Sequence, residues 1–142
     1  PGPLTFVLNL KKSSEISNQS TIKEEEVNGE NRIVLKLPPM LAPIKAAILP
    51  LTKKDGLPEK AREILKKIQT DFNCQYEEKD SIGKRYRRQD AIGTPFCITV
   101  DHQSLEDNTV TLRNRDNMNQ ERIAIANIHS IISKKVDLKN YL

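Results

Sequence analysis

An apolar run, IKAAILPL at residues 44–51, is followed after a short turn by the clearest helical pattern in the sequence. The run is apolar on both of its faces apart from Lys45, which suits a central strand covered on each side. Pro50 must lie near its end, because a central strand cannot lose a backbone donor. In the segment KKDGLPEKAREILKKIQTDFN the apolar residues recur at helical spacing and form one stripe: Leu57, Ala61, Ile64, Leu65, Ile68 and Phe72. A buried strand followed by an amphipathic helix indicates an α/β fold in which the helix packs on a sheet.

The rest of the sequence supplies shorter elements of both kinds. We expect strands at 32–37, 74–80, 95–101, 110–115 and 122–127, a short helix or turn at 81–93, a turn at 106–108, and a last helix at 128–136 with Asn127 as its N-cap. This order predicts a mixed sheet with helices on both faces and a ligand crevice beyond the carboxyl ends of the strands.

Residues 11–31 differ from the rest of the chain because they are mostly polar. They contain the acidic run 24–26 and an Asn-Gly pair at 28–29, which is the chemistry of a linker or mobile loop. The apolar octet 3–10 resembles a strand or helix fragment whose packing partner is missing. We therefore divide the chain into 1–31, a partly flexible linker or remnant of a preceding catalytic region, and 32–142, a folded domain.

Length and composition are those of one globular domain: 142 residues, of which 37% are hydrophobic and 30% charged, with a net charge of +4. The positive balance weakly favours an anionic partner. The two cysteines, Cys74 and Cys97, lie beside apolar sequence, so we interpret them as buried thiols in a reducing compartment. No apolar run is long enough to span a bilayer, and we expect a soluble cytoplasmic protein.

No catalytic constellation stands out. The sequence contains no Gly-x-Gly-x-x-Gly, no phosphate-binding P-loop and no nucleophile elbow. Glu77 and Glu78 are adjacent in a predicted strand and point to opposite faces, so they cannot easily share a substrate. His102 and His129 lack metal-ligand spacing to a cysteine. We therefore predict neither catalytic residues nor a metal site.

The segment SIGKRYRRQDAIG, residues 81–93, places four cations within the five positions from Lys84 to Arg88. If the segment is helical, Lys84 and Arg88 share a face, and like charges at this spacing repel by a few tenths of a kcal/mol. The cluster is either a solvated face with local ion pairs or a surface that binds nucleic-acid phosphate, which would relieve the repulsion. Tyr86 could stack on a base, but a core position is favoured for a ring between Ile82 and Ile92.

A second pair of cations, Arg113 and Arg115, lies on one face of the strand predicted at 110–115, while Val110 and Leu112 face the core. Two interpretations remain open. The arginines form either an exposed ladder paired to Asp116 or Glu106, or a rigid two-pronged reader of bases beside the basic cluster.

Three stretches together resemble one known family: APIKAAILPL, SIGKRYRRQDAIGTPFCITVD and LEDNTVTLRNRDNMNQERI. They are similar to the C-terminal anticodon-binding domain of the dimeric, bacterial-type glycyl-tRNA synthetases. The resemblance runs from about Arg32 to about Ile132, and shorter matches extend to the threonyl, prolyl and histidyl enzymes. It implies a five-stranded mixed sheet flanked by three helices that binds a tRNA anticodon.

The resemblance also implies site residues. The segment at 79–88 and the strand at 110–115 match parts of the family that approach the anticodon loop. Arg113 matches an arginine that reads an anticodon base in the related threonyl enzyme. Together with the basic cluster, the nucleic-acid-binding candidates are Lys79, Asp80, Lys84, Arg85, Arg87, Arg88, Glu106, Arg113 and Arg115.

In the whole enzyme, ATP and Mg²⁺ bind to a catalytic domain that precedes this one. The arginine motif of that domain is not supplied by PGPLTFVLNLKK, and LPPM at 37–40 lacks the family's expected His-Pro. We therefore expect no cofactor in this chain and a glycine-specific tRNA as its partner. We also expect a monomer here and a homodimer for the parent glycine–tRNA ligase.

The chain is interpreted as an excised domain or as a stand-alone paralogue. A paralogue could act as a nucleic-acid-binding accessory subunit that holds duplex or a partner protein. A small α/β enzyme that binds a nucleotide at the sheet edge is a third alternative, but it lacks a phosphate loop.

Overall fold

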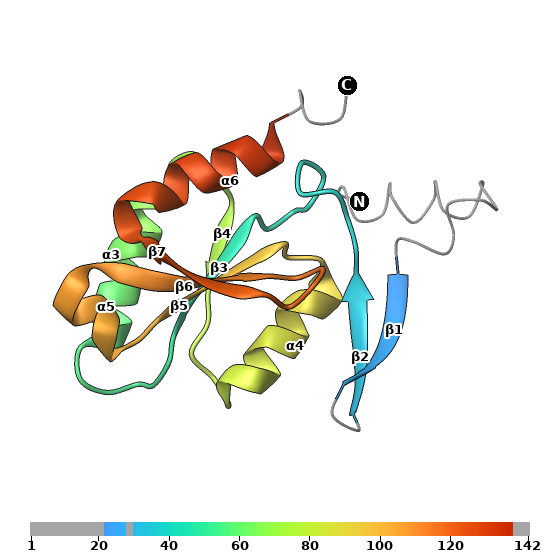
Figure 1. The fold of residues 1–142 in the computed structure, drawn as a ribbon, viewed down its shortest axis with the longest axis horizontal. Helices are drawn as coiled ribbons and strands as arrows, with labels where there is room; N and C mark the ends of the chain where they lie inside the picture. The colour runs from blue at the N-terminus through green and yellow to red at the C-terminus, as the bar shows by residue number, and fades with distance from the viewer. Residues whose placement is uncertain (1–21, 28–29, 138–142) are drawn as a thin grey trace.

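A computed structural model describes residues 22–27 and 30–137. Its centre is a five-stranded mixed sheet in the order β4-β3-β5-β6-β7 (Figure 1). The strands are β3 (Ala46–Pro50), β4 (Cys74–Tyr76), β5 (Phe96–Val100), β6 (Thr109–Asn114) and β7 (Gln120–Ala124). β3 runs parallel to β4 and β5, whereas β6 is antiparallel to both of its neighbours. The prediction of a five-stranded mixed sheet is confirmed.

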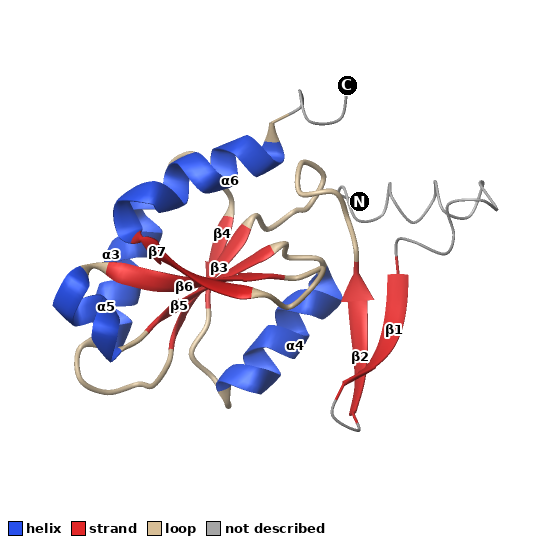
Figure 2. Ribbon diagram, viewed as in Figure 1, coloured by secondary structure: helices blue, strands red, loops and turns tan. Residues whose placement is uncertain are grey.

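Helices cover both faces of this sheet (Figure 2). They are α3 (Leu57–Ile68), α4 (Ile82–Ile92), the short α5 (His102–Asp107) and α6 (Ile128–Val136), which follows the 3₁₀ turn η1 (Ile125–Asn127). The main core joins α3 and α6 to one face of the sheet, and the apolar side of α4 packs on the other face.

The central strand and the first helix form as predicted. All five residues of β3 are buried, and Pro50 is its last residue. Pro58 lies in the first turn of α3, where its missing N–H has no intrahelical partner to lose. The helix ends at Ile68, before the last residue of the predicted stripe, but Phe72 still packs against the core.

A separate two-stranded hairpin lies beside α4 (Figure 1). It consists of β1 (Ile22–Val27) and β2 (Glu30–Leu35), which pair antiparallel. The prediction of a linker or mobile loop is therefore wrong for 22–27 and 30–31, and the strand expected at 32–37 is confirmed for 32–35, within β2. Residues 1–21 and 28–29 lie outside the described residues. The acidic run is accommodated because Glu25 lies opposite Arg32 in the register, and the two side chains form an ion pair of 2.6 Å.

Several boundaries differ from the sequence predictions, and the strand expected at 74–80 already ends at Tyr76. The turn predicted at 106–108 is instead the C-terminal end of helix α5, which Asp101 begins through a reciprocal capping box with Ser104. Asn108 ends it in the left-handed region at φ 56°. The strand predicted at 122–127 ends at Ala124, and η1 follows. No helix among the described residues is long and apolar enough to cross a membrane.

Candidate nucleic-acid interface

Helix α4 carries the basic cluster, and its cations point in different directions. Ser81 caps the helix by accepting a hydrogen bond from the Lys84 backbone N–H. Arg85 is buried, Arg87 is half-buried, and Lys84 and Arg88 are exposed. The cluster is therefore not one uniform charged face.

Arg85 points inward and holds the end of the central strand. Its Nη1 donates to the Pro50 carbonyl at 2.5 Å, and its Nη2 donates to the Leu51 carbonyl at 3.1 Å. Its Nε is buried and has no hydrogen-bond partner among the described residues. Burial lowers the pKa of Arg85. From this position Arg85 ties α4 to the end of β3.

Arg88 fixes the loop that follows β4. It forms an ion pair with Glu77, donates to Asp80 Oδ2 at 2.8 Å and donates to the Lys79 carbonyl at 2.9 Å. The hydrogen bond from Arg88 lowers the pKa of Asp80, and the nearby charges of Lys84 and Lys53 lower it further. The candidates Lys79, Asp80, Lys84 and Arg88 therefore lie together at one site.

Arg113 and Arg115 are buried, so the expectation that they project from an open face is wrong. Arg113 donates to both oxygens of Asp90, at 2.9 and 3.1 Å, and its guanidinium lies 4.6 Å from the centre of the Tyr86 ring. Arg115 donates to the carbonyls of Gly93 and Leu37, at 2.9 and 2.6 Å. α4 covers this part of the sheet, and its Asp90 supplies the countercharge.

Tyr86 belongs to the core, as the sequence favoured. It packs against the small apolar cluster of Ala47, Leu49 and Cys97, and its hydroxyl lies 2.6 Å from Thr99 Oγ1. Burial raises the pKa of its hydroxyl. Its ring is occupied by Arg113 and the sheet and does not offer a free stacking face.

Unpaired cations gather at the carboxyl ends of β3 and β4. Among the described residues, five cations in and around this edge form no side-chain hydrogen bond or ion pair: Lys53, Lys54, Lys79, Lys84 and Arg87. Lys53 and Lys54 lie in the loop after β3, Lys79 lies in the loop after β4, and the other two lie on α4. The ends of parallel strands are where open α/β sheets bind ligands.

Arg87 borders a shallow groove between the hairpin and α4. The groove has a volume of about 290 Å³ and is lined by Asn31, Ile33, Arg87, Arg88 and Ala91. Ile33 is 54% exposed in it. Glu106, the remaining candidate, is exposed on α5, which follows the carboxyl end of β5.

The sequence interpretation missed a polar network around a single arginine, Arg122 on β7, which bonds to the end of β5 and to β6. Arg122 donates to the two oxygens of Asp101 at 2.6 and 2.7 Å, to Thr109 Oγ1 at 2.7 Å and to Thr111 Oγ1 at 3.2 Å. These bonds from Arg122 lower the pKa of Asp101 to about 2, with the Ser104 hydrogen bonds contributing. The only local signal was Asp101 at a strand end, three residues before Ser104.

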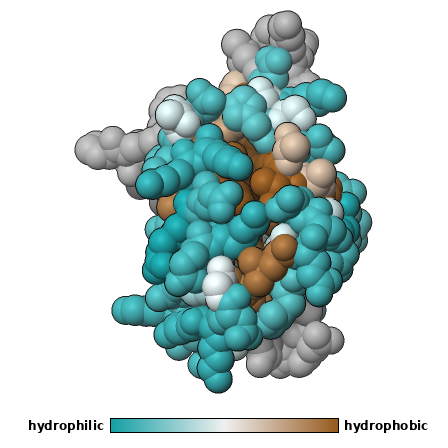
Figure 3. All heavy atoms as spheres, turned by 90° about the vertical axis from the view of Figure 1, so that its left-hand side faces the viewer, coloured by the Kyte–Doolittle hydropathy of each residue, from teal (hydrophilic) through white to brown (hydrophobic). Residues whose placement is uncertain are grey.

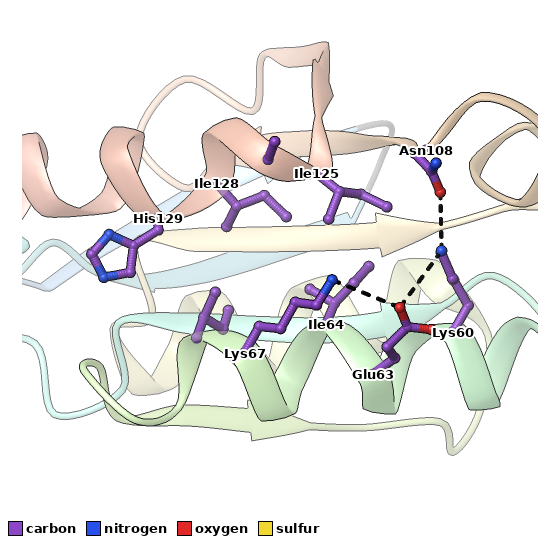
Figure 4. A pocket seen from close by; sticks show the side chains of 10 residues that line it. Lys60, Glu63, Ile64, Lys67, Asn108, Ile125, Ile128 and His129 are labelled. Atoms are coloured by element: carbon purple, nitrogen blue, oxygen red, sulfur yellow. Dashed lines mark hydrogen bonds and ion pairs between the residues drawn. The ribbon is translucent and has the colours of Figure 1, made fainter.

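Another hollow lies between α3 and the start of α6. Figure 3 shows apolar side chains among hydrophilic ones on this side of the molecule, and Figure 4 shows the lining of a cavity of about 450 Å³. Lys60 and Lys67 on its rim both pair with Glu63, and His129 pairs with Asp71. Each of these rim cations thus has an acidic partner, unlike the cations at the carboxyl ends of β3 and β4.

Comparison with known proteins identifies the fold. Residues 45–135 match the model of the anticodon binding domain family, which is more than half of the chain. The chain therefore belongs to the anticodon-binding domain family. The β1–β2 hairpin lies before the matched residues.

The similar proteins are glycine–tRNA ligases. The chain is 53% identical over 118 residues to the glycine–tRNA ligase of Borrelia hermsii, an alignment that covers 83% of this chain and 26% of that protein. It is 56% identical over 119 residues to the enzyme of Clostridium perfringens, covering 80% of this chain and 25% of that protein. The chain thus spans about a quarter of the length of these relatives.

Proposed function

We propose that this chain is the tRNA-recognition domain of a glycine–tRNA ligase and binds the anticodon end of a glycine tRNA. The observation that carries the proposal is the set of unpaired cations at the carboxyl edge of the sheet, in a chain that belongs to the anticodon-binding domain family. Unpaired lysine and arginine side chains gain from phosphate contacts because binding releases counterions from the RNA.

The exposed candidates make the direct contacts in this proposal. Lys79, Lys84 and Arg87, joined by Lys53 and Lys54, bind phosphates and fix the position of the loop. Arg88, Asp80 and Glu106 present donors and acceptors to unstacked bases, since single-stranded loops expose their hydrogen-bonding edges. The buried arginines Arg85, Arg113 and Arg115 hold the frame beneath this surface.

The parent enzyme in this proposal is an ATP-dependent glycine–tRNA ligase that acts as a homodimer in the cytoplasm. ATP and Mg²⁺ would bind in its catalytic region. The role of this chain is binding, so it raises the specificity of the reaction by selecting the tRNA.

Competition binding tests this proposal directly. The 142-residue chain is titrated with labelled glycine tRNA against unlabelled glycine tRNA, the same tRNA with a changed anticodon, and a DNA duplex of similar length. Each good base contact contributes roughly 1–3 kcal/mol. We therefore expect the changed anticodon to compete at least tenfold less well than glycine tRNA. Equal competition by the duplex would contradict anticodon recognition and favour an accessory subunit that binds duplex.

A further inference from the structure

Asp90, near the C-terminal end of α4, is shared by two arginines from two different sheets. Its Oδ2 accepts from Arg32 Nε at 2.8 Å and from Arg113 Nη2 at 3.1 Å, and its Oδ1 accepts from Arg113 Nη1 at 2.9 Å. Arg32 belongs to the hairpin strand β2, and Arg113 belongs to β6 of the main sheet. Asp90 and Arg32 are both 0% exposed. One carboxylate on α4 therefore ties the hairpin to the five-stranded sheet.

Arg32 adds two further contacts to this junction. Its Nη1 donates to Glu25 Oε2 at 2.6 Å, and its Nη2 donates to the Arg115 carbonyl. Burial raises the pKa of Glu25, but the hydrogen bond and charge of Arg32 outweigh it, and the pKa lies below its usual value. The guanidinium thus bridges β1, α4 and the end of β6.

The chain packs closely at the end of α4 next to this junction. Gly93, at φ +89°, ends the helix, and a Cβ at this position would lie 3.1 Å from Leu37 Cδ1 and 3.3 Å from the Leu35 carbonyl oxygen. Leu35 ends β2, and Leu37 lies just beyond it. The hairpin is therefore held against α4 by apolar contact as well as by charge.

The junction fixes the C-terminal half of the helix that carries Lys84 and Arg87. Arg85 and Arg88 fix its other half, through the ends of β3 and β4. A buried ion pair has little net effect on stability, but the loss of one partner leaves an uncompensated buried charge. The position of α4 relative to the hairpin and the sheet is therefore held close to the one that keeps these side chains paired. The orientation of α4 as a whole, and with it that of the two unpaired cations, thus depends in part on a side chain of the hairpin.

We propose that the β1–β2 hairpin is part of the tRNA-binding apparatus, with Arg32 and Asp90 as positioning residues for α4 and Arg113. The inference rests on the proposed tRNA function and adds a segment that lies outside the matched family residues 45–135. Arg32 itself touches no RNA. It acts by holding Asp90, and through Asp90 it holds the helix that presents Lys84 and Arg87.

The test compares Arg32→Met with Lys23→Met in the 142-residue chain. Lys23 is the matched control because it lies on the same hairpin and pairs with the same Glu25, at 3.5 Å, but does not reach Asp90. Two quantities are measured on folded protein: the ¹⁵N–¹H NMR signal of the Arg113 side chain, assigned with Arg113→Lys, and the affinity for glycine tRNA. For Arg32→Met we expect a shifted or broadened Arg113 signal and a five- to tenfold weaker affinity. For Lys23→Met we expect an unchanged signal and an affinity within twofold of the wild type.

Arg32→Lys keeps the inference testable if Arg32→Met does not fold. It retains the charge but cannot fork to the three partners of Arg32, and we expect about threefold weaker tRNA binding. A folded Arg32 variant that binds tRNA within twofold of Lys23→Met would overturn the inference. Absence of tRNA binding by the wild type would instead overturn the proposed function itself, so the two failures are distinguishable.

Discussion

Arg113 on β6 and Asp90 on α4 form a bidentate ion pair inside the protein, with Nη–Oδ distances of 2.9 and 3.1 Å. Both side chains are almost fully buried, and Arg32 donates to the same carboxylate. The pair lies between the sheet and the helix that carries the unpaired cations. The relative position of α4 and β6 therefore has to keep both side chains paired, since a buried charge without a partner is costly.

Removal of the Asp90 charge should be severely destabilising. Asp90→Asn leaves Arg113 buried without a carboxylate partner and leaves Arg32 with Glu25 alone, and breaking a buried pair in this way typically costs about 3–5 kcal/mol. We expect a loss of this size in the free energy of unfolding from urea denaturation. Glu63→Gln is the control, because Glu63 is 54% exposed where it pairs with Lys67, which is 64% exposed, and we expect a loss below about 1 kcal/mol. Equal losses in the two variants would contradict the burial of the Asp90 network.

Alanine substitutions at the two glycines near the ends of α4 should change the free energy of unfolding in opposite directions. Gly93 has φ +89° and close neighbours, so Gly93→Ala is both strained and crowded and should lower the free energy of unfolding by about 2 kcal/mol. Gly83 lies in the first turn of the helix, and a Cβ at this position would meet no heavy atom within 4 Å. Gly83→Ala should raise stability by about 0.5 kcal/mol. Thermal or urea unfolding of both variants measures the difference, and a tolerated Gly93→Ala would contradict the close approach of the hairpin.

The contribution of Asp101 to the free energy of unfolding should be lost at acid pH. The bonds from Arg122 lower its pKa from 3.8 to about 2 in the folded protein. A carboxyl group with a lowered folded-state pKa stabilises the fold above its unfolded pKa, and that contribution is lost as the pH falls through the folded value. Asp101→Asn keeps the N-cap but loses the charge, so we expect a loss of about 1–2 kcal/mol at pH 7, discounted for solvent screening. The difference from the wild type should shrink between pH 4 and pH 2, and a constant difference would argue against this assignment.

The two thiols should be inert in the folded protein. Burial raises the pKa of Cys97 to about 12 and that of Cys74 to about 11. Because the thiolate is the reactive form, labelling by a disulfide reagent at about pH 8 should be slow at both. Cys97 is 1% exposed and should react only on unfolding, whereas Cys74 is half-buried and should react first. Rapid labelling of both thiols in native protein would contradict the core position of β5.

The sheet and the long helices could be predicted because their signals are local. The run at 44–51 and the stripe from Leu57 to Ile68 each show the period of one element. Of the hairpin, only β2 could be predicted in this way, from the alternation at 32–37, whereas β1 could not. The acidic run of β1 is typical of a solvated segment when taken alone, and it forms a strand where Glu25 pairs with Arg32 across the register.

The candidate site could be predicted only in part, because its local signals do not show which distant residues pack together. Alternation along β6 correctly places Arg113 and Leu112 on opposite faces of the sheet. The pattern does not show, however, that α4 covers the face on which Arg113 lies. The partner Asp90 is 23 positions away in the sequence, so no local pattern links the two. The loop cations Lys53 and Lys54 were missed because their significance depends on the fold that brings the ends of β3 and β4 together.

The salt dependence of tRNA binding tests the central claim most directly. The affinity of the 142-residue chain for glycine tRNA is measured over a series of salt concentrations for the wild type, for Lys84→Gln with Arg87→Gln, and for Lys66→Gln. Lys66 is the control because it is an exposed cation on α3, on the other side of the sheet from α4. We predict weaker binding of the double variant and a slope of log K against log salt reduced by about 1.4, which is roughly 0.7 for each lost phosphate contact. Lys66→Gln should keep the wild-type slope, and an unchanged slope in the double variant would contradict phosphate binding by α4.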